Sequence, residues 1–282
     1  MRTTNRTRTQ WVELADRNLA ECARLCALMD RAGEVEIKDD LQLVASRTRF
    51  PAGMFNSGQA LGPAPDAAQA RSWLERALVF YAARGRGFSI YVRGAGDAAL
   101  ADACSALGMT KGGAPPGMLL GAPVPEPALP AGTRIERVAD ARGLADFGAV
   151  AAAGFALQGL PEKITRGLFT DPCRVLSPEV AYYVAYVDDQ PASSALCLLS
   201  HGIAGLYWIA TQPSAQRRGL GSAITRRASN LAFEDGAAGV ILQASNHGEP
   251  VYRRIGFEEI TRYGWFFMTA DQVAQRASEQ LG

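Results

Sequence analysis

The sequence predicts an α/β (α+β) protein in which a mixed, mostly antiparallel sheet is flanked by helices. Stretches such as residues 10–30 repeat apolar residues at helical spacing, which predicts amphipathic helices. Between them lie short runs rich in aromatic and β-branched residues, such as 180–187 and 205–210, which predict strands. Turn signals at Asp188-Asp189-Gln190-Pro191 and at His201-Gly202 join neighbouring strands, so part of the sheet should be antiparallel.

The chain length and a proline- and glycine-rich segment near the middle of the chain predict two domains. The chain has 282 residues, of which 48% are hydrophobic, and this is enough for two cores. Residues 111–132 are rich in proline and glycine and read as a semi-extended linker around a short strand at 118–120. We therefore predict a boundary near residues 121–132, with one domain over 1–125 and a second over 126–282.

The elements of the first half follow from the same signals. A helix is expected over 10–30, strands at 35–37 and 41–46, and a loop over 51–65. Asp66 is a good N-cap for a helix that runs to about Arg84. A strand at 88–92 then precedes a helix that we expect to be capped by Asp97 and to end at Gly108.

The second half restarts with an alternating strand at 133–138 and a helix from Asp140 to about Phe155. A short helix is expected within 160–170, followed by strands at 180–187, 192–199 and 205–210. After a glycine-containing loop comes a helix that should end at the cap residue Gly236. The strand 240–242, a segment with Tyr252, the strand 265–268 and a terminal helix 271–281 complete the chain.

Charge and cysteine content exclude several kinds of partner. The formal net charge of +1 gives no general attraction to nucleic acid or to an anionic membrane. Residues 1–9 are basic but contain no apolar core, so we expect no secretory signal. Five scattered cysteines and two histidines without metal-binding spacing predict no metal site and reduced core thiols. The expected location is the cytoplasm.

The stretch 205–257 carries the chemistry. A predicted strand ends at Ala210, the loop Gln216-Arg217-Arg218-Gly219-Leu220-Gly221-Ser222 follows, and a helix begins. Glycines let backbone N–H groups approach an anion, and a helix start adds about half a positive charge, so this arrangement can hold phosphates. A P-loop would need a lysine after Gly221, and a dinucleotide fingerprint would need a third glycine where Ile224 stands.

The loop Q-R-R-G-L-G-S resembles the Q/R-x-x-G-x-G/A pyrophosphate loop of the GNAT superfamily of N-acetyltransferases. The downstream strand, the tyrosine segment and the Y-x-x-x-G-F ending at Phe257 are also similar to that family. The first half shares the order of elements, and its Leu107-Gly108-Met109 matches Ile255-Gly256-Phe257 in kind, but it has no such loop. It is expected to be a degenerate GNAT-like or substrate-shaping domain.

The resemblance implies a GNAT fold and an N-acetyltransferase that uses acetyl-CoA as cosubstrate and a primary amine of a small molecule or peptide as acceptor. It implies that the two central strands splay apart to admit the thioester, and that Tyr252 protonates the departing thiolate. Asn246 either binds the pantetheine arm or forms an Asx turn. The implied coenzyme contacts are therefore Ile209, Ala210, Thr211, Gln216, Arg217, Arg218, Gly219, Leu220, Gly221, Ser222 and Asn246.

The general base departs from the family pattern. Many members carry a glutamate on the strand before the loop, but residues 206–210 hold no acid. A water chain or one of His201, His247 and Glu179 would have to remove the proton. Two alternatives therefore stay open: a non-catalytic acyl-CoA-binding regulatory module, and a CoA-thioester enzyme of another reaction type. The sequence does not identify the acceptor, and the terminal helix is compatible with a homodimer.

Overall fold

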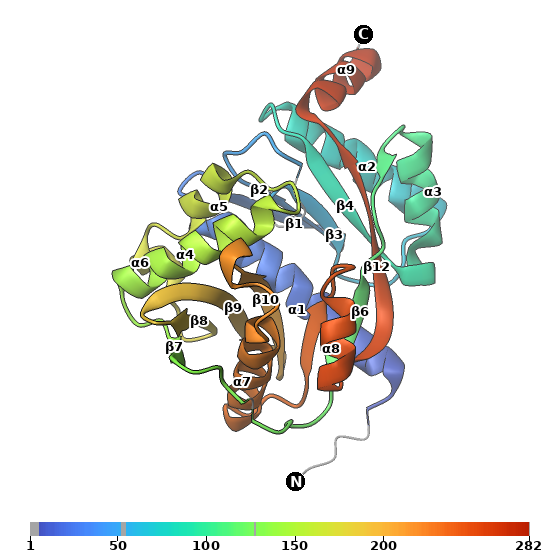
Figure 1. Ribbon diagram of the computed structural model, residues 1–282. Coiled ribbons are helices and arrows are strands. Elements are labelled where there is room, and N and C mark those ends of the chain that lie inside the picture. Colours follow the sequence, from blue (N-terminus) through green and yellow to red (C-terminus); the bar gives the residue numbers. More distant parts are fainter. Residues whose placement is uncertain (1–5, 52–54, 127, 282) are drawn as a thin grey trace. The chain divides into compact units, whose positions relative to one another are not determined.

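The protein is described from a computed structural model that covers residues 6–51, 55–126 and 128–281 (Figure 1). The first five residues of the basic stretch 1–9 lie outside this range. The chain divides into two compact units: unit 1 comprises residues 1–18 and 116–260, and unit 2 comprises residues 19–115 and 261–282. Helix α1 (Arg8–Met29) and strand β12 (Glu258–Met268) each run from one unit into the other.

Unit 1 is built on strands in the order β6-β11-β10-β9-β8-β7. The pairings are antiparallel except that of β10 with β11, which is parallel. The strands are β6 (Pro116–Leu120), β7 (Thr133–Arg137), β8 (Val180–Val187), β9 (Gln190–Ser200), β10 (Ile203–Thr211) and β11 (Val240–Gln243). The helices are α4 (Ala141–Ala156), α5 (Glu162–Leu168), α6 (Pro172–Val175), α7 (Leu220–Glu234) and α8 (Glu249–Ile255).

Alternating side chains of β8 pack against different helices on the two faces of this sheet. Tyr182 packs edge-on against Phe147 of α4, with ring centroids 5.0 Å apart. Its neighbour Tyr183 belongs to the opposite core, which contains Ile224 and Ala228 of α7. Since successive residues of a strand point to opposite faces, α4 and α7 lie on opposite sides of the sheet (Figure 1).

Short turns connect the antiparallel strands of unit 1 as predicted. Asp188 and Asp189 have φ of 49° and 64°, and His201 and Gly202 have φ of 52° and 76°. Two consecutive residues with positive φ form the hairpin turn whose twist matches that of the flanking strands. Both turns are therefore confirmed in position, but the first is shorter than predicted, because Gln190 and Pro191 already belong to β9.

Unit 2 has the strand order β1-β2-β3-β4-β12, with β5 paired to β12. Its strands are β1 (Glu34–Lys38), β2 (Leu41–Ala45), β3 (Ser57–Ala60), β4 (Phe88–Arg93) and β5 (Thr110–Lys111). Its helices are α2 (Ala67–Ala82), α3 (Ala98–Ala106) and α9 (Ala270–Leu281). The β3–β4 pair is parallel, and the others are antiparallel.

Two expectations for this half are wrong. The predicted loop 51–65 contains strand β3, whose sequence Ser-Gly-Gln-Ala has none of the branched or aromatic residues that mark a strand, although all four residues are buried. The carboxylate of Asp97 does not cap α3. Instead, its oxygens accept hydrogen bonds from the backbone N–H and guanidinium of Arg93 at 2.8–2.9 Å.

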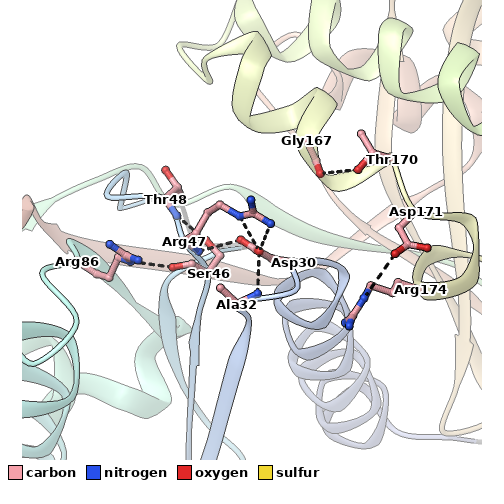
Figure 2. A network of polar contacts seen from close by, with 10 residues as sticks. All are labelled: Asp30, Ala32, Ser46, Arg47, Thr48, Arg86, Gly167, Thr170, Asp171 and Arg174. Atoms are coloured by element: carbon pink, nitrogen blue, oxygen red, sulfur yellow. Dashed lines mark hydrogen bonds and ion pairs between the residues drawn. The ribbon is translucent and has the colours of Figure 1, made fainter.

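A second carboxylate fixes the end of α1 within unit 2. Asp30 accepts hydrogen bonds from the Arg47 backbone N–H and Nε, both at 2.8 Å, and from the Ala32 N–H at 3.0 Å (Figure 2). Burial acts to raise the pKa of Asp30, but the hydrogen bonds and charge of Arg47 outweigh it and lower this pKa. The ionised form of Asp30 is therefore favoured by folding.

The compact units do not follow the two halves of the sequence. Strand β6, at the end of the first half, pairs with β11 of the second half inside unit 1. The last residues of β12, at the end of the second half, pair with β4 of the first half inside unit 2. The two halves thus exchange strands, and the assignment of separate domains to 1–125 and 126–282 stays a prediction.

Three further observations concern the described residues. No helix among them combines the length and apolarity needed to cross a bilayer. Within the same residues, no three His, Cys, Asp or Glu side chains gather as metal ligands would. Cys22, Cys26, Cys104 and Cys197 are buried, as expected of core thiols, whereas Cys173 is exposed.

Candidate functional site

The parallel strands β10 and β11 separate after two residues. Ala204 pairs with Val240 and Gly205 pairs with Ile241, whereas the rest of β10, up to Thr211, has no register with β11. Beyond Ile241, β11 instead continues along β6. Among the described residues, β11 therefore forms no strand pairing with β10 beyond Gly205, and we call this β11-facing stretch, residues 206–211, the open edge of β10. An extended ligand can form strand-like hydrogen bonds with such an edge.

A β-bulge lies on the open part of β10. The register with β9 shifts between Tyr207 and Ala210, and Trp208 has φ of 51°, a left-handed conformation that bulky residues rarely adopt. Side chains of β9 hold this backbone: Ser194 Oγ donates to the Trp208 carbonyl at 3.1 Å, and Ser193 Oγ donates to the Ala210 carbonyl at 2.7 Å. These hydrogen bonds from β9 therefore hold the bulge in place.

Helix α7 begins next to the end of β10. Gly219 is its N-cap with φ of 82°, and no side chain caps the helix. The first helical hydrogen bond runs from the Ala223 N–H to the Gly219 carbonyl at 3.0 Å. The N–H groups of Leu220, Gly221 and Ser222 precede it and have no partner available within the helix. This helix start can therefore accept an anion.

Gly221 joins the helix start to the strand end. A Cβ built on it would lie 3.4 Å from Thr211 Oγ1, a tight contact. The Thr211 hydroxyl is itself 3.0 Å from Ser193 Oγ, which places it in the hydrogen-bonded end of β10. The open strand edge and the uncapped helix start are thus adjacent, as one elongated ligand would require.

The polar side chains of the loop are exposed. Arg217 and Arg218 take part in none of the ion pairs formed among the described residues, and Arg217 has φ of 61°. Gln216 Nε2 lies 3.5 Å from the Thr211 carbonyl, which is long for a hydrogen bond. These side chains are accessible to an anion at the helix start.

Tyr252 lies on α8 and is 9% exposed. Its ring belongs to the core that contains Ile224 and Phe257, and its centroid is 6.0 Å from that of Phe257. Burial raises the pKa of Tyr252, so the phenol keeps its proton at neutral pH. Within the described part of the chain, no other group bonds its hydroxyl, which can therefore act as a donor.

The strand register separates the three candidates for the general base. His201 lies in the turn before β10, and the carbonyl of Glu179 accepts the Leu199 N–H at the same end of the sheet. His247 follows β11, which is parallel to β10, so it lies at the end where Thr211 and the loop lie. All three side chains are exposed.

Asn246 is exposed and follows β11 directly after Ser245. Ser245, rather than Asn246, fixes this turn: its Oγ accepts the Gly248 N–H at 3.2 Å, and its carbonyl accepts the Glu249 N–H at 2.9 Å. Among the described residues, the Asn246 side chain makes no hydrogen bond. The Asx-turn interpretation is therefore not realised.

Aromatic rings line the face of the bulge that is covered by α4. Trp208 is edge-on to Phe155 and to Phe169, with centroids 4.9 and 5.5 Å apart. Phe155 belongs to α4, and Phe169 follows α5. Beyond α5, the short helix α6 carries the pair Arg174–Asp171, with a shortest N–O distance of 3.7 Å (Figure 2).

One polar residue near the strand divergence carries no functional signal in the sequence. Asn18 of α1 is fully buried in unit 1, and its Oδ1 accepts the hydroxyl proton of Tyr207 at 2.7 Å. Tyr207 stands two residues after Gly205, the last residue of β10 that pairs with β11. Asn18 lies on an otherwise helical pattern 189 residues away in sequence, so only the tertiary fold could reveal it.

Known proteins resemble this chain in part of its sequence and in its fold. Residues 178–259 match the model of the acetyltransferase (GNAT) domain. A search of curated protein sequences found no match. Among solved structures, the fold is similar to a GCN5-related N-acetyltransferase from Kribbella flavida, with a TM-score of 0.68 and 22% identity over 87% of this chain and 95% of the other.

Two further structures have the same fold over most of both chains. A GCN5-related N-acetyltransferase from Sphaerobacter thermophilus aligns with a TM-score of 0.60 and 15% identity over 91% of this chain and 93% of the other. A tandem GNAT protein from the clavulanic acid biosynthesis pathway aligns with a TM-score of 0.56 and 16% identity over 94% and 95%. The chain thus has the GNAT fold, and its residues 178–259 match the acetyltransferase (GNAT) domain, so the predicted recognition and fold class are confirmed.

Proposed function

We propose that this protein is an N-acetyltransferase that transfers the acetyl group of acetyl-CoA to a primary amine of a small molecule or peptide. One observation carries the proposal: within a GNAT domain, the open edge of β10 and the uncapped start of α7 are adjacent at Thr211 and Gly221. An acyl-CoA has an extended amide-containing arm joined to a pyrophosphate, which matches these two features in order.

In this proposal the N–H groups of residues 218–222 bind the pyrophosphate, helped by Gln216 and Arg217. The backbone of Ile209, Ala210 and Thr211 pairs with the pantetheine arm. Asn246 lies at the same end of the sheet and is available to the arm because its side chain has no competing bond. The thioester then lies where β10 and β11 separate.

The proposed reaction is a direct attack. The amine nitrogen adds to the thioester carbonyl carbon, the carbon–sulfur bond breaks, and the thiolate takes the hydroxyl proton of Tyr252. The attacking nitrogen loses one proton and becomes an amide N–H, and this proton balances the one that Tyr252 gives to the thiolate. His247 is the favoured acceptor for it among the three candidates, directly or through water, because it lies at the loop end of the sheet.

The test is thermal unfolding of the whole protein with acetyl-CoA, with ATP and NAD as controls. A ligand at 100 times its dissociation constant stabilises the folded state by about 2.7 kcal/mol, so a clear rise of Tm is expected with acetyl-CoA alone. The complex would then be offered a panel of amines, and the released thiol and product mass measured. An equal shift with ATP, or none, contradicts the proposed donor.

The two alternatives predict different outcomes of the same assay. A regulatory module would bind acetyl-CoA but release no thiol with any amine. A CoA-thioester enzyme of another type would give a product whose mass lacks the added acetyl group. Amine-dependent release of thiol together with an acetylated product supports the proposal over both.

A further inference from the structure

Asn18 occupies a buried position with all of its polar atoms engaged. Oδ1 accepts the Tyr207 hydroxyl at 2.7 Å, and Nδ2 donates to Ser200 Oγ at 2.8 Å and to the Leu198 carbonyl at 3.2 Å. Buried polar groups are costly unless paired, so this amide holds β9 and β10 in one arrangement. The side chain thereby links α1 to two strands of unit 1.

The same contact requires a glycine in β10. A Cβ at Gly205 would overlap Asn18 Oδ1 and come within 2.8 Å of the Tyr207 hydroxyl. The Tyr207 side chain therefore folds back over Gly205, and the amide of Asn18 closes over both. Gly205 is also the last residue of β10 that pairs with β11, so the linkage sits at the point where the two strands begin to diverge.

The bulge follows at once. Trp208, with its positive φ, is the residue after Tyr207, and the register shift with β9 begins there. A tyrosine that is fixed on one side of the strand limits where the next residue can turn. The Asn18–Tyr207 hydrogen bond thus constrains the start of the open edge, whereas the helix start at Gly219 lies twelve residues after Tyr207.

We propose that Asn18 is a positioning residue for the acyl end of the acyl-CoA site: by fixing Tyr207 over Gly205, it keeps the open segment of β10 apart from β11. This inference rests on the proposed function. Residues of the first helix would then shape a site whose other elements all come from the second half of the chain. Asn18 itself touches no reacting atom.

The test compares two ligands that share the nucleotide but differ in the arm. Dissociation constants are measured by calorimetry for acetyl-CoA and for 3′-phosphoadenosine 5′-diphosphate, which reaches the helix start but has no pantetheine. In Asn18→Ala, acetyl-CoA is expected to bind about tenfold or more weakly, while the affinity for the nucleotide changes less than about twofold. A general loss of stability would weaken both ligands alike.

Asn230 provides the matched control. It is a buried asparagine of the same unit whose side chain also makes three hydrogen bonds, two with the backbone of Val124 and one with Glu126. In Asn230→Ala, the affinities for both ligands are expected to change less than about twofold. A tenfold loss of acetyl-CoA binding in this control as well would overturn the positioning role of Asn18.

Tyr207→Phe keeps the ring but removes the hydroxyl, so it tests the hydrogen bond to Asn18 without leaving a cavity where the ring stood. It is expected to weaken acetyl-CoA selectively, and the double variant with Asn18→Ala should be no weaker than the worse single variant, because both remove one interaction. Unchanged acetyl-CoA affinity in both single variants, or additive losses, would overturn the inference. If the parent protein binds neither ligand, the proposed function itself fails.

Discussion

Helices α2 and α7 each follow a short parallel strand pairing, but their N-termini differ in whether they can bind an anion. Before α2, Ser57 and Gly58 of β3 pair with Ser89 and Ile90 of β4; before α7, Ala204 and Gly205 of β10 pair with Val240 and Ile241 of β11. Each parallel pairing is short, and each places a glycine opposite an isoleucine. The two halves of the chain thus share this local arrangement of paired strands ahead of a helix.

The difference lies in how each helix is capped. The Asp66 carboxylate accepts the Ala68 and Gln69 N–H groups at 2.9 and 2.8 Å, so the start of α2 already holds an anion of its own. The start of α7 has Gly219 and no side-chain cap. The connection also differs, because Ala67 follows Gly58 by nine residues and Leu220 follows Gly205 by fifteen. The start of α2 thus lacks both the longer loop and the uncapped N–H groups of α7.

The helix ends repeat the contrast. Gly108 and Gly256 have φ of 81° and 117°, and the residue after each donates to a carbonyl five positions earlier, that of Cys104 in the first half and Tyr252 in the second. Burial raises the pKa of the Cys104 thiol to about 12. Where the second half has a phenol that can donate a proton, the first half has an inert core thiol. The helix end of the second half thus carries the proposed proton donor, and the corresponding helix end of the first half does not.

The largest effect is expected from giving α7 the carboxylate that α2 already has. In Gly221→Asp, a negative side chain stands at the proposed phosphate position, and like charges brought together there cost several kcal/mol. Acetyl-CoA affinity should fall on the order of 100-fold or more, while the far-UV circular dichroism stays unchanged. Calorimetric titration measures the loss.

Gly167→Asp is the control for this substitution. Gly167 lies on α5 in the same unit, is exposed, and a Cβ there would meet no atom within 4 Å. Its acetyl-CoA affinity should match that of the parent. If Gly221→Asp binds acetyl-CoA normally, the helix start is not the pyrophosphate site, and the contrast between the two helices has no functional meaning.

Tyr252→Phe tests the second contrast. Loss of a general acid lowers turnover by about 100-fold or more, whereas acetyl-CoA binding should remain within a fewfold of the parent because the ring still packs in the core. Thiol release with an active amine is the measurement. Tyr183→Phe is the matched control. Tyr183 is a buried tyrosine of the same core, and burial raises its pKa to about 12. Full turnover in Tyr252→Phe would reduce Tyr252 to a packing residue.

Local signals predicted most of this fold. The strand 180–187 and the caps Asp66, Asp140 and Gly236 were identifiable because each depends on residues close in sequence. The strand exchange was not, because pairing between β6 and β11 joins residues more than 100 positions apart. Strand β3 was missed for a related reason: its small residues are buried by the tertiary structure and carry no strand pattern of their own.

The candidate site divides in the same way. The loop 216–222 could be recognised because its glycines and arginines are contiguous. The bulge at Trp208 and the role of Asn18 depend on side chains from β9 and α1, and no local pattern marks them. Asp97 is the opposite case, in which a strong local signal did not hold. Its carboxylate binds the guanidinium of Arg93 instead of capping α3, because a charge-assisted ion pair competes with capping.

A moderate effect is expected from removing the cap of α2. Asp66→Ala should lower the free energy of unfolding by about 1 kcal/mol, since it leaves two N–H groups without their carboxylate. Acetyl-CoA should still bind at one molecule per chain with unchanged affinity, because the first half lacks the longer loop. Chemical denaturation and calorimetry measure the two quantities. A second bound acetyl-CoA would show that the cap alone separates the two helices.

The smallest effect concerns the ends of the first helix of each half. The chain after α1 is fixed by Asp30, whereas the turn after α4 is closed by backbone hydrogen bonds such as that from the Gly159 N–H to the Ala156 carbonyl.

The pKa of Asp30 is lowered by folding. Its contribution to stability is therefore complete above the ordinary value of 3.8 and is lost as the pH falls below it through the folded-state pKa. Asp30→Asn should therefore cost less than about 1 kcal/mol at pH 7, because the Arg47 side chain is exposed, and the Tm difference from the parent should shrink below about pH 4. Asp189→Asn, at an exposed pair with Arg134 in the second half, should cost less than about 1 kcal/mol. A Tm difference for Asp30→Asn that is constant from pH 3 to 8 would show that the Asp30 carboxylate stabilises this helix end through shape rather than charge.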